Sequence, residues 1–108
     1  MSKMEIDCCA FPALKTVKNF ISTDELLIRI RSCANCGTFW YCHEIAYETN
    51  SSEYYDRCKW YVRLSPEEAK ELTDADQAPN PEMFRGRAGF VRDDDGMCKT
   101  TGIPSFVN

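Results

Sequence analysis

The residues that most clearly indicate chemistry in this sequence are the cysteines at positions 33 and 36. They lie in the run Cys33-Ala34-Asn35-Cys36-Gly37. Two thiolates that are two residues apart can bind the same metal ion, and a glycine directly after the second one allows a tight turn with a positive φ. This spacing is typical of a zinc knuckle. It therefore predicts half of a structural zinc site, with zinc as the cofactor.

A closed zinc site needs four ligands, so two more must come from other parts of the chain. Along an extended strand, Cys42 would lie roughly 20 Å from Cys36, and Cys58, expected opposite Glu44, roughly 25 Å. Both are therefore poor ligands, whereas a separate segment that ends in two cysteines can pack beside the knuckle. We predict that the metal ligands are Cys8, Cys9, Cys33 and Cys36.

The sequence leaves several alternatives open for the cysteines. One member of the Cys8–Cys9 pair alone can be a ligand, with His43 or Cys98 completing the site, and Cys58 also stays open as a ligand. A thioredoxin-like redox motif should open a helix, but strand-forming residues follow Cys36.

Cys42 and Cys58 can both be core residues if the strand register brings them to one face of the sheet. A nucleophile pair of Cys42 and His43 is disfavoured, because adjacent strand residues point to opposite faces.

The number of cysteines and the hydropathy pattern predict the compartment. The chain has 108 residues and seven cysteines, an odd number that does not fit a secreted disulfide framework. Its start lacks the apolar stretch of a secretory signal, and no apolar run approaches the roughly 20 residues that span a bilayer. We therefore expect a cytoplasmic protein without membrane association. In a reducing compartment, clustered cysteines indicate metal ligands or buried thiols.

The charge distribution predicts the kind of partner. The formal net charge is −4, and the acidic excess lies in residues 65–108. An acidic chain is not typical of nucleic-acid-binding proteins, which present basic surfaces. A protein partner is therefore favoured over nucleic acid.

Hydrophobic periodicity and turn signals predict an α+β fold. We expect a small antiparallel three-stranded meander with two short helices and the zinc knuckle. Apolar residues at helical spacing predict the first helix, and the run Ser65-Pro66-Glu67-Glu68 predicts a capping box that starts the second. The expected helices cover 12–21 and 66–73, and the expected strands cover 26–31, 38–48 and 54–64.

The chain length predicts one domain over residues 1–108. Within it, we expect residues 74–108 to be an irregular acidic C-terminal part that packs on the sheet. A small hairpin is expected there, around Asp93-Asp94-Asp95-Gly96. Met4–Cys9 is expected to form a short strand, and 49–53 a polar turn.

One face of the third expected strand supports an alternative function. In an even strand register, Tyr55, Lys59 and Tyr61 would adjoin Phe39, Tyr41 and His43, giving a basic, aromatic surface. Such surfaces stack and hold single-stranded nucleic acid. The alternative is a nucleic-acid-binding zinc ribbon that uses Arg29, Arg31, Arg57, Lys59 and Tyr61.

The stretch from Leu26 to Leu72 resembles small bacterial zinc-ribbon-like proteins. The shared features are a strand, the C-x-x-C-G knuckle, an aromatic strand and a closing run Arg-Leu-Ser-Pro-Glu-Glu-Ala at 63–69. The chain departs from a standard zinc ribbon because it lacks a second C-x-x-C. In size and acidity it is also similar to immunity proteins of polymorphic toxin systems. This similarity implies a non-enzymatic protein-binding module that inhibits a basic toxin domain.

Overall fold

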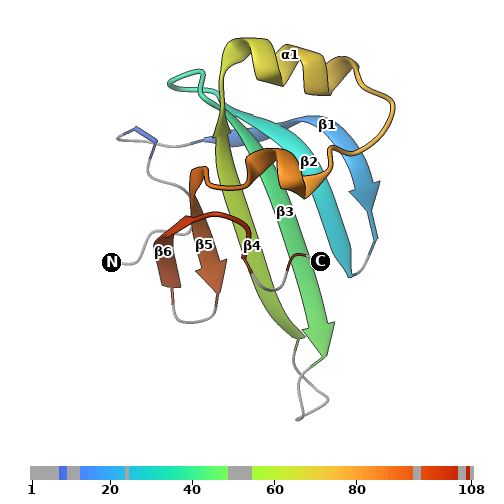
Figure 1. The fold of residues 1–108 in the computed structure, drawn as a ribbon, viewed down its shortest axis with the longest axis vertical. Helices are drawn as coiled ribbons and strands as arrows, with labels where there is room; N and C mark the ends of the chain where they lie inside the picture. Colours follow the sequence, from blue (N-terminus) through green and yellow to red (C-terminus); the bar gives the residue numbers. More distant parts are fainter. Residues whose placement is uncertain are drawn as a thin grey trace.

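The fold is a six-stranded antiparallel sheet in which the strands follow one another in chain order (Figure 1). It was obtained as a computed structural model that describes residues 8–9, 13–23, 25–48, 55–93, 96–104 and 107. Within these residues there is one α-helix, α1 (Pro66–Asp74), and one 3-10 helix, η1 (Pro81–Phe84). The strands are β1 (Leu14–Ser22), β2 (Leu26–Cys33), β3 (Phe39–Glu48), β4 (Tyr55–Leu64), β5 (Ala88–Asp93) and β6 (Gly96–Thr101).

The prediction of a three-stranded meander with two short helices is wrong, because the described residues form a six-stranded sheet. One difference is the first strand, which was expected to be a helix. The region expected as a helix over 12–21 forms β1, which pairs with β2. The pairing register shifts between Thr16 and Lys18 and again between Asn19 and Ile21. Such bulges add residues to one strand and break its alternation of period two. The apolar residues of β1 therefore have irregular spacing, which resembles helical spacing.

The C-terminal third of the chain supplies two more strands. The hairpin expected there is present as β5 and β6, and Asp93 pairs with Gly96. Instead of belonging to an irregular part that packs on the sheet, this hairpin extends the sheet by pairing β5 with β4, for example Phe90 with Tyr61. Of the remaining expected elements, the turn over 49–53 and most of the strand over 4–9 lie outside the described residues.

Helix α1 begins as its sequence predicts. The side chain of Ser65 accepts a hydrogen bond from the N–H of Glu68, and the Glu68 carboxylate accepts one from the N–H of Ser65. Pro66 occupies the first turn, where its missing N–H leaves no donor unpaired. In the described part of the chain, no helix combines the length and the apolarity needed to cross a membrane.

The register between β3 and β4 decides which side chains share a face. Cys42 pairs with Tyr61 and Ile45 pairs with Cys58, so Cys42 and Cys58 lie on opposite faces of the sheet. The even register considered from the sequence is therefore wrong by one residue, and a one-residue slip exchanges the faces of a strand. Lys59 and Tyr61 consequently share a face with Cys42 and Glu44, instead of with Tyr41 and His43.

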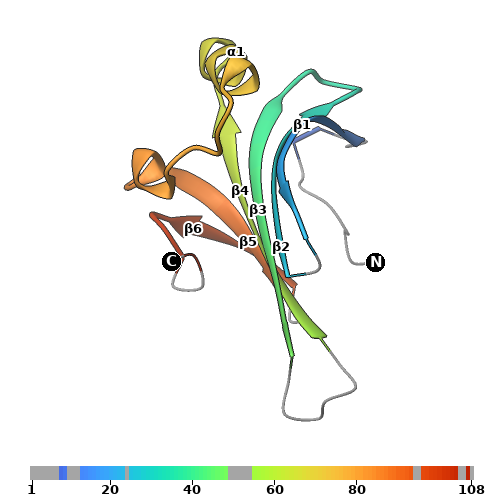
Figure 2. The ribbon, with the colours of Figure 1, turned by 90° about the vertical axis from the view of Figure 1, so that its right-hand side faces the viewer.

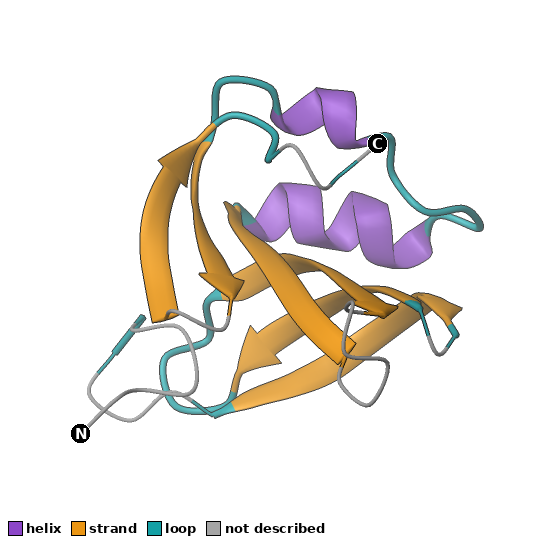
Figure 3. Ribbon diagram, turned by 90° about the horizontal axis from the view of Figure 1, so that it is seen from below, coloured by secondary structure: helices purple, strands orange, loops and turns teal. Residues whose placement is uncertain are grey.

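Both faces of the sheet carry a hydrophobic cluster. On one face, α1 and η1 pack against the sheet, which curves around them (Figures 2 and 3). This helix-side core is made of Ile28, Ile30, Tyr41, Trp60, Val62, Leu64, Ala69, Leu72, Phe84 and Val107. The opposite-face cluster is formed by Trp40, Cys42 and Tyr61, with Cys8, Leu14 and Phe90 packed against it.

Candidate metal centre

The turn between β2 and β3 has the backbone geometry of a knuckle. The N–H of Cys33 donates to the carbonyl of Thr38 over 2.9 Å, and the N–H of Gly37 donates back to the carbonyl of Cys33 over 2.8 Å. Gly37 has a φ of 78°, which side chains other than glycine rarely adopt. These bonds place Cys33 and Cys36 at one corner of the sheet.

The four predicted ligands meet at this corner. The Sγ atoms of Cys8, Cys9, Cys33 and Cys36 all lie within 4.8 Å of one another. The Sγ of Cys36 is 3.5 Å from that of Cys8, and the Sγ of Cys33 is 3.8 Å from that of Cys9. A tetrahedral ion with metal–sulfur bonds of about 2.3 Å separates its sulfurs by about 3.8 Å, whereas a disulfide bond is about 2.05 Å long. The four thiols are thus close enough to bind a metal ion.

Hydrogen-bond donors surround the two knuckle sulfurs. The backbone N–H of Ala13 points at the Sγ of Cys33 over 3.4 Å and, with the amides of Cys36 and Asn35, lowers the pKa of Cys33 to about 6. The hydroxyl of Thr38 lies 3.2 Å from the Sγ of Cys36 and, with its backbone amide, lowers the pKa of that thiol. Donors of this kind stabilise the thiolate, which is the form that binds metal.

Cys8 has the opposite electrostatic setting. Its burial, followed by the neighbouring sulfurs of Cys36 and Cys33, raises the pKa of the Cys8 thiol to about 12. Without a cation among them, four sulfurs at this distance cannot all ionise, because like charges disfavour one another. A bound metal ion would remove this repulsion and displace the remaining protons.

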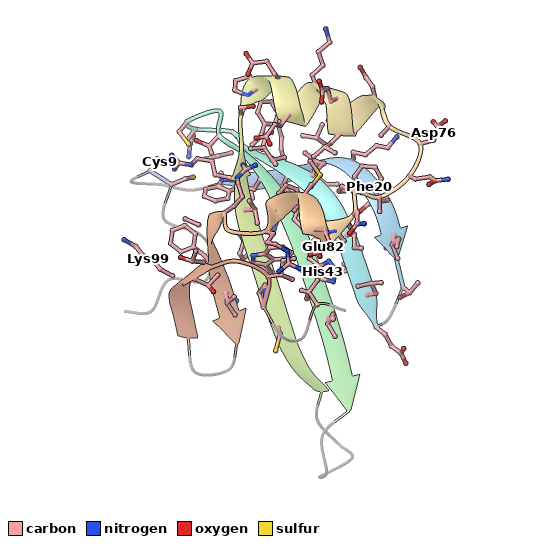
Figure 4. All side chains as sticks on the ribbon, in the orientation of Figure 1. Cys9, Phe20, His43, Asp76, Glu82 and Lys99 are labelled. Atoms are coloured by element: carbon pink, nitrogen blue, oxygen red, sulfur yellow. The ribbon has the colours of Figure 1, made fainter. Side chains whose placement is uncertain are left out.

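Three of the other cysteine and histidine candidates, His43, Cys42 and Cys58, lie away from this group. His43 is 6% exposed in the helix-side half of the molecule, where its Nδ1 lies 2.9 Å from the hydroxyl of Tyr41, and burial lowers its pKa. Cys42 lies in the opposite-face cluster, and Cys58 lies on the other face of the sheet. The side chain of Cys98 lies outside the described residues. Figure 4 shows Cys9 and His43 in separate parts of the molecule.

Two contributors to the site were not predicted from the sequence. Ala13 supplies only a backbone N–H, and that donor reaches Cys33 because the start of β1 pairs with the end of β2, as Leu14 does with Cys33. Nothing local to Ala13 signals this role. Thr38 follows the C-x-x-C-G run directly, so its hydroxyl is a signal that the sequence did contain.

Comparison with known proteins adds no further information about this site. No protein-family model, curated protein or solved structure matches the chain. We therefore base the functional proposal on the geometry of the four cysteines.

Proposed function

We propose that this chain is a non-enzymatic protein-binding module whose fold is stabilised by one zinc ion bound to Cys8, Cys9, Cys33 and Cys36. The observation that carries the proposal is the approach of four Sγ atoms to within 4.8 Å of one another. Four cysteine ligands are typical of structural zinc, whereas catalytic zinc keeps one position open for water or substrate. Thiolate ligands also favour zinc over calcium or magnesium, which prefer oxygen.

Cobalt substitution tests the ligand set directly. Tetrahedral cobalt bound by four thiolates absorbs strongly in the visible and near-ultraviolet, and these bands depend on the number of sulfur ligands. Metal-free reduced protein titrated with cobalt(II) should develop these bands at one equivalent and lose them when zinc is added. Cys9→Ser should change the spectrum, and Cys58→Ser, which keeps all four proposed ligands, should not. A spectrum of octahedral cobalt in the wild-type chain would contradict the proposal.

The acidic side chains on and after α1 support a basic protein as the partner. Glu67, Glu71 and Asp74 are exposed on α1, and Asp76 extends from the loop that follows (Figure 4). A surface with an excess of one charge sign steers a partner of the opposite sign and disfavours others. A basic toxin domain, neutralised by this chain as an immunity-type inhibitor, is the partner that the chain's size and acidity favour.

Charge-neutralising variants test this partner. Binding to a basic toxin domain encoded beside the gene should weaken in Glu71→Gln and should weaken with added salt. Glu25→Gln removes the same charge from an exposed position in the β1–β2 turn and serves as the matched control. Absence of binding to that domain, or equal loss in the two variants, would contradict the acidic-surface proposal while leaving the zinc site untouched.

A thiol redox function is the second candidate, and one observation favours it. The pKa of Cys33 is lowered to about 6, which a redox-active thiol requires. However, Cys33 is only 2% exposed, whereas reactive cysteines are accessible to their substrates. If the candidate is correct, metal-free protein should form a Cys33–Cys36 disulfide that thioredoxin reduces rapidly, and slow reduction would exclude it.

Three of the five residues of the nucleic-acid alternative have contacts within the protein or are buried. Tyr61 is 1% exposed, so its ring cannot stack on a base. Arg29 forms an ion pair with Glu44 at 3.7 Å, and Arg31 donates to the carbonyl of Leu14 over 3.1 Å. These contacts hold both arginines against the protein.

A further inference from the structure

A pocket of about 530 Å³ lies on the face of the sheet opposite the helices, and no step of the proposed function uses it. Its lining combines exposed cations with aromatic rings on β3, β4, β5 and β6. The residues that matter for its chemistry are Trp40, Arg63, Ala88, Phe90, Lys99 and Thr101. A volume of this size is in the range of small-molecule sites.

The strand register explains why these side chains converge. Trp40 pairs with Arg63 across β3 and β4, and Phe90 pairs with Lys99 across β5 and β6. Directly paired residues of antiparallel strands point to the same face. Phe90 also pairs across β4 with Tyr61, the neighbour of Trp40 in the opposite-face cluster. The pocket therefore adjoins this buried cluster.

The aromatic part of the pocket is held rigidly. The rings of Trp40 and Phe90 meet edge to face with their centroids 6.0 Å apart, and the Arg63 guanidinium lies over the Trp40 ring at 5.3 Å. Trp40 itself is 1% exposed, so packing fixes its orientation. A planar apolar group that entered the pocket would therefore meet the partly exposed ring of Phe90, which rests on the fixed ring of Trp40.

No counterion for the charged part of the pocket is found in the part of the chain that the structure describes. Among the described residues, neither Arg63 nor Lys99 forms an ion pair, and no acidic side chain lines the pocket. Nearby Arg87 is different, because it binds the Glu68 carboxylate through two hydrogen bonds of 2.8 and 3.1 Å. The chain has more acidic than basic side chains, with a net charge of −4, so carboxylates are plentiful. That none of the described ones pairs with Arg63 or Lys99 leaves both cations available to an anionic ligand. Lys99 extends outward from β6 in Figure 4, where it can reach an incoming anion.

We infer that this pocket binds an aromatic carboxylate, with the carboxylate held by Arg63 and Lys99 and the ring packed on Phe90, which the buried Trp40 supports. The carboxylate gains charge-assisted hydrogen bonds, and the ring gains apolar and edge-to-face contacts. The same chemistry is offered by a free aromatic acid and by an aromatic residue at the C-terminus of a polypeptide. This site goes beyond the proposed function and does not depend on the identity of the metal.

Titration of the isotope-labelled, metal-loaded protein, followed by amide nuclear magnetic resonance, tests the inference. Naphthalene-2-carboxylate represents a free acid, and N-acetyl-phenylalanine represents a C-terminal residue. Each is compared with its uncharged amide. Saturable shifts are expected at the amides of Gly89, Phe90 and Lys99, with little change at Ala69 on α1. The tighter of the two acids identifies the source of the ligand.

Single charge removals locate the anion site. Lys99→Met should weaken the binding of the preferred acid by about tenfold or more, because hydrogen bonds to charged groups are worth that much. Arg63→Met should have a similar effect while keeping an apolar stem on Trp40. Lys70→Met removes an exposed charge from α1, on the other face, and is the matched control.

The titrations give one result that supports the anion site and three that contradict it. Tenfold discrimination between acid and amide, lost in Lys99→Met and kept in Lys70→Met, supports the site. Equal affinity for acid and amide, shifts that map elsewhere, or no shift with either acid would overturn it. Because none of these variants replaces a cysteine, an unchanged metal content and an unchanged spectral dispersion establish that each variant is folded.

Discussion

At the scale of single residues, the candidate metal centre depends on groups that orient the sulfurs as much as on the cysteines themselves. The N–H of Ala13 donates to the Sγ of Cys33, and the Thr38 hydroxyl lies 3.2 Å from the Sγ of Cys36, where it can donate to the ionised thiol. Such contacts favour the thiolate and hold it in place, and removing them from metal sites costs affinity even when all ligands remain. They therefore give a test of the site that leaves the cysteines intact.

Thr38→Val should weaken zinc binding. Valine keeps the shape of threonine but removes the hydroxyl that lies 3.2 Å from the Sγ of Cys36. The affinity for zinc should fall by about tenfold, the lower end of the range for partners of metal ligands. Competition with a chromophoric chelator measures it. Thr101→Val, at an exposed site on β6, is the control, and equal affinities in both variants would count against the role of Thr38.

Gly37→Ala should also weaken zinc binding. The backbone of Gly37 has a φ of 78°, and a Cβ there would meet no atom within 4 Å, so the cost is conformational. An alanine in this region costs about 1 kcal/mol and distorts the knuckle turn. Gly86→Ala carries the same backbone cost at a φ of 79°, but it lies away from the cysteines. Only Gly37→Ala should reduce the affinity for zinc, and a matching loss in Gly86→Ala would refute this explanation.

The parts of the candidate metal centre that a short sequence motif encodes could be predicted from the sequence. The C-x-x-C-G run predicts the knuckle turn directly. The sequence predicts Cys8 and Cys9 as the other ligands because Cys42 and Cys58 lie too far along the strands, and the four sulfurs do lie together. The contribution of Ala13 was not predictable, because it depends on the pairing of β1 with β2.

At the scale of elements, an ion pair between Glu68 and Arg87 connects α1 to the sheet. The carboxylate of Glu68 completes the capping box and also binds the guanidinium of Arg87, which donates in turn to the carbonyl of Arg63. The hydrogen bond from Arg87, foremost among several contacts, lowers the pKa of Glu68 below its ordinary 4.5. The ionised carboxylate therefore stabilises the folded state.

Glu68→Gln should lower the free energy of unfolding in a pH-dependent way. Near pH 7 the loss should be about 1 kcal/mol, since the pair is partly exposed and solvent screens it. A lowered folded-state pKa gives stability that is present above pH 4.5 and is lost as the pH falls through the folded-state value. The difference between wild type and variant in urea denaturation should therefore shrink below pH 4.5. Glu67→Gln is the control, and a pH-independent difference would contradict the assignment.

The approach of β5 to β4 depends on Gly89. A Cβ at this position would overlap the carbonyl oxygen of Tyr61 and would lie 3.4 Å from the Nε1 of Trp60. Gly89→Ala should therefore destabilise the fold by about 1–3 kcal/mol, as overpacking does. Thermal unfolding measures this loss, and Ala88→Ser at the exposed neighbouring position should change the melting temperature little. Equal melting temperatures for wild type and Gly89→Ala would contradict this packing.

Helices and strands that a local sequence pattern indicates were predicted. Strands whose position depends on pairing with a segment far away in the chain were not. The capping box identified α1, alternation identified β2, and a run of aromatic and β-branched residues identified β3. The bulges of β1 hid its strand pattern, and nothing near Phe90 indicates that β5 pairs with β4. The pocket was missed for the same reason, because its lining comes from four strands.

At the scale of the whole molecule, the candidate metal centre connects the N-terminal segment to the sheet. Cys8 and Cys9 lie before β1, whereas Cys33 and Cys36 belong to the β2–β3 turn. Cys8 also packs against the opposite-face cluster, which includes Trp40. A metal ion here would close a loop of more than twenty residues and hold this cluster in place, so its removal should lower the stability of the whole chain.

The most direct test of the zinc site is the metal content of untagged, freshly reduced protein, measured by elemental and native mass spectrometry alongside Cys33→Ser and Cys58→Ser. We expect about one zinc ion per chain in the wild type and in Cys58→Ser, and none in Cys33→Ser. The zinc-free variant should also melt at a lower temperature. A wild-type protein without metal, or a Cys33→Ser variant that retains its zinc, would contradict a zinc ion held by these four cysteines.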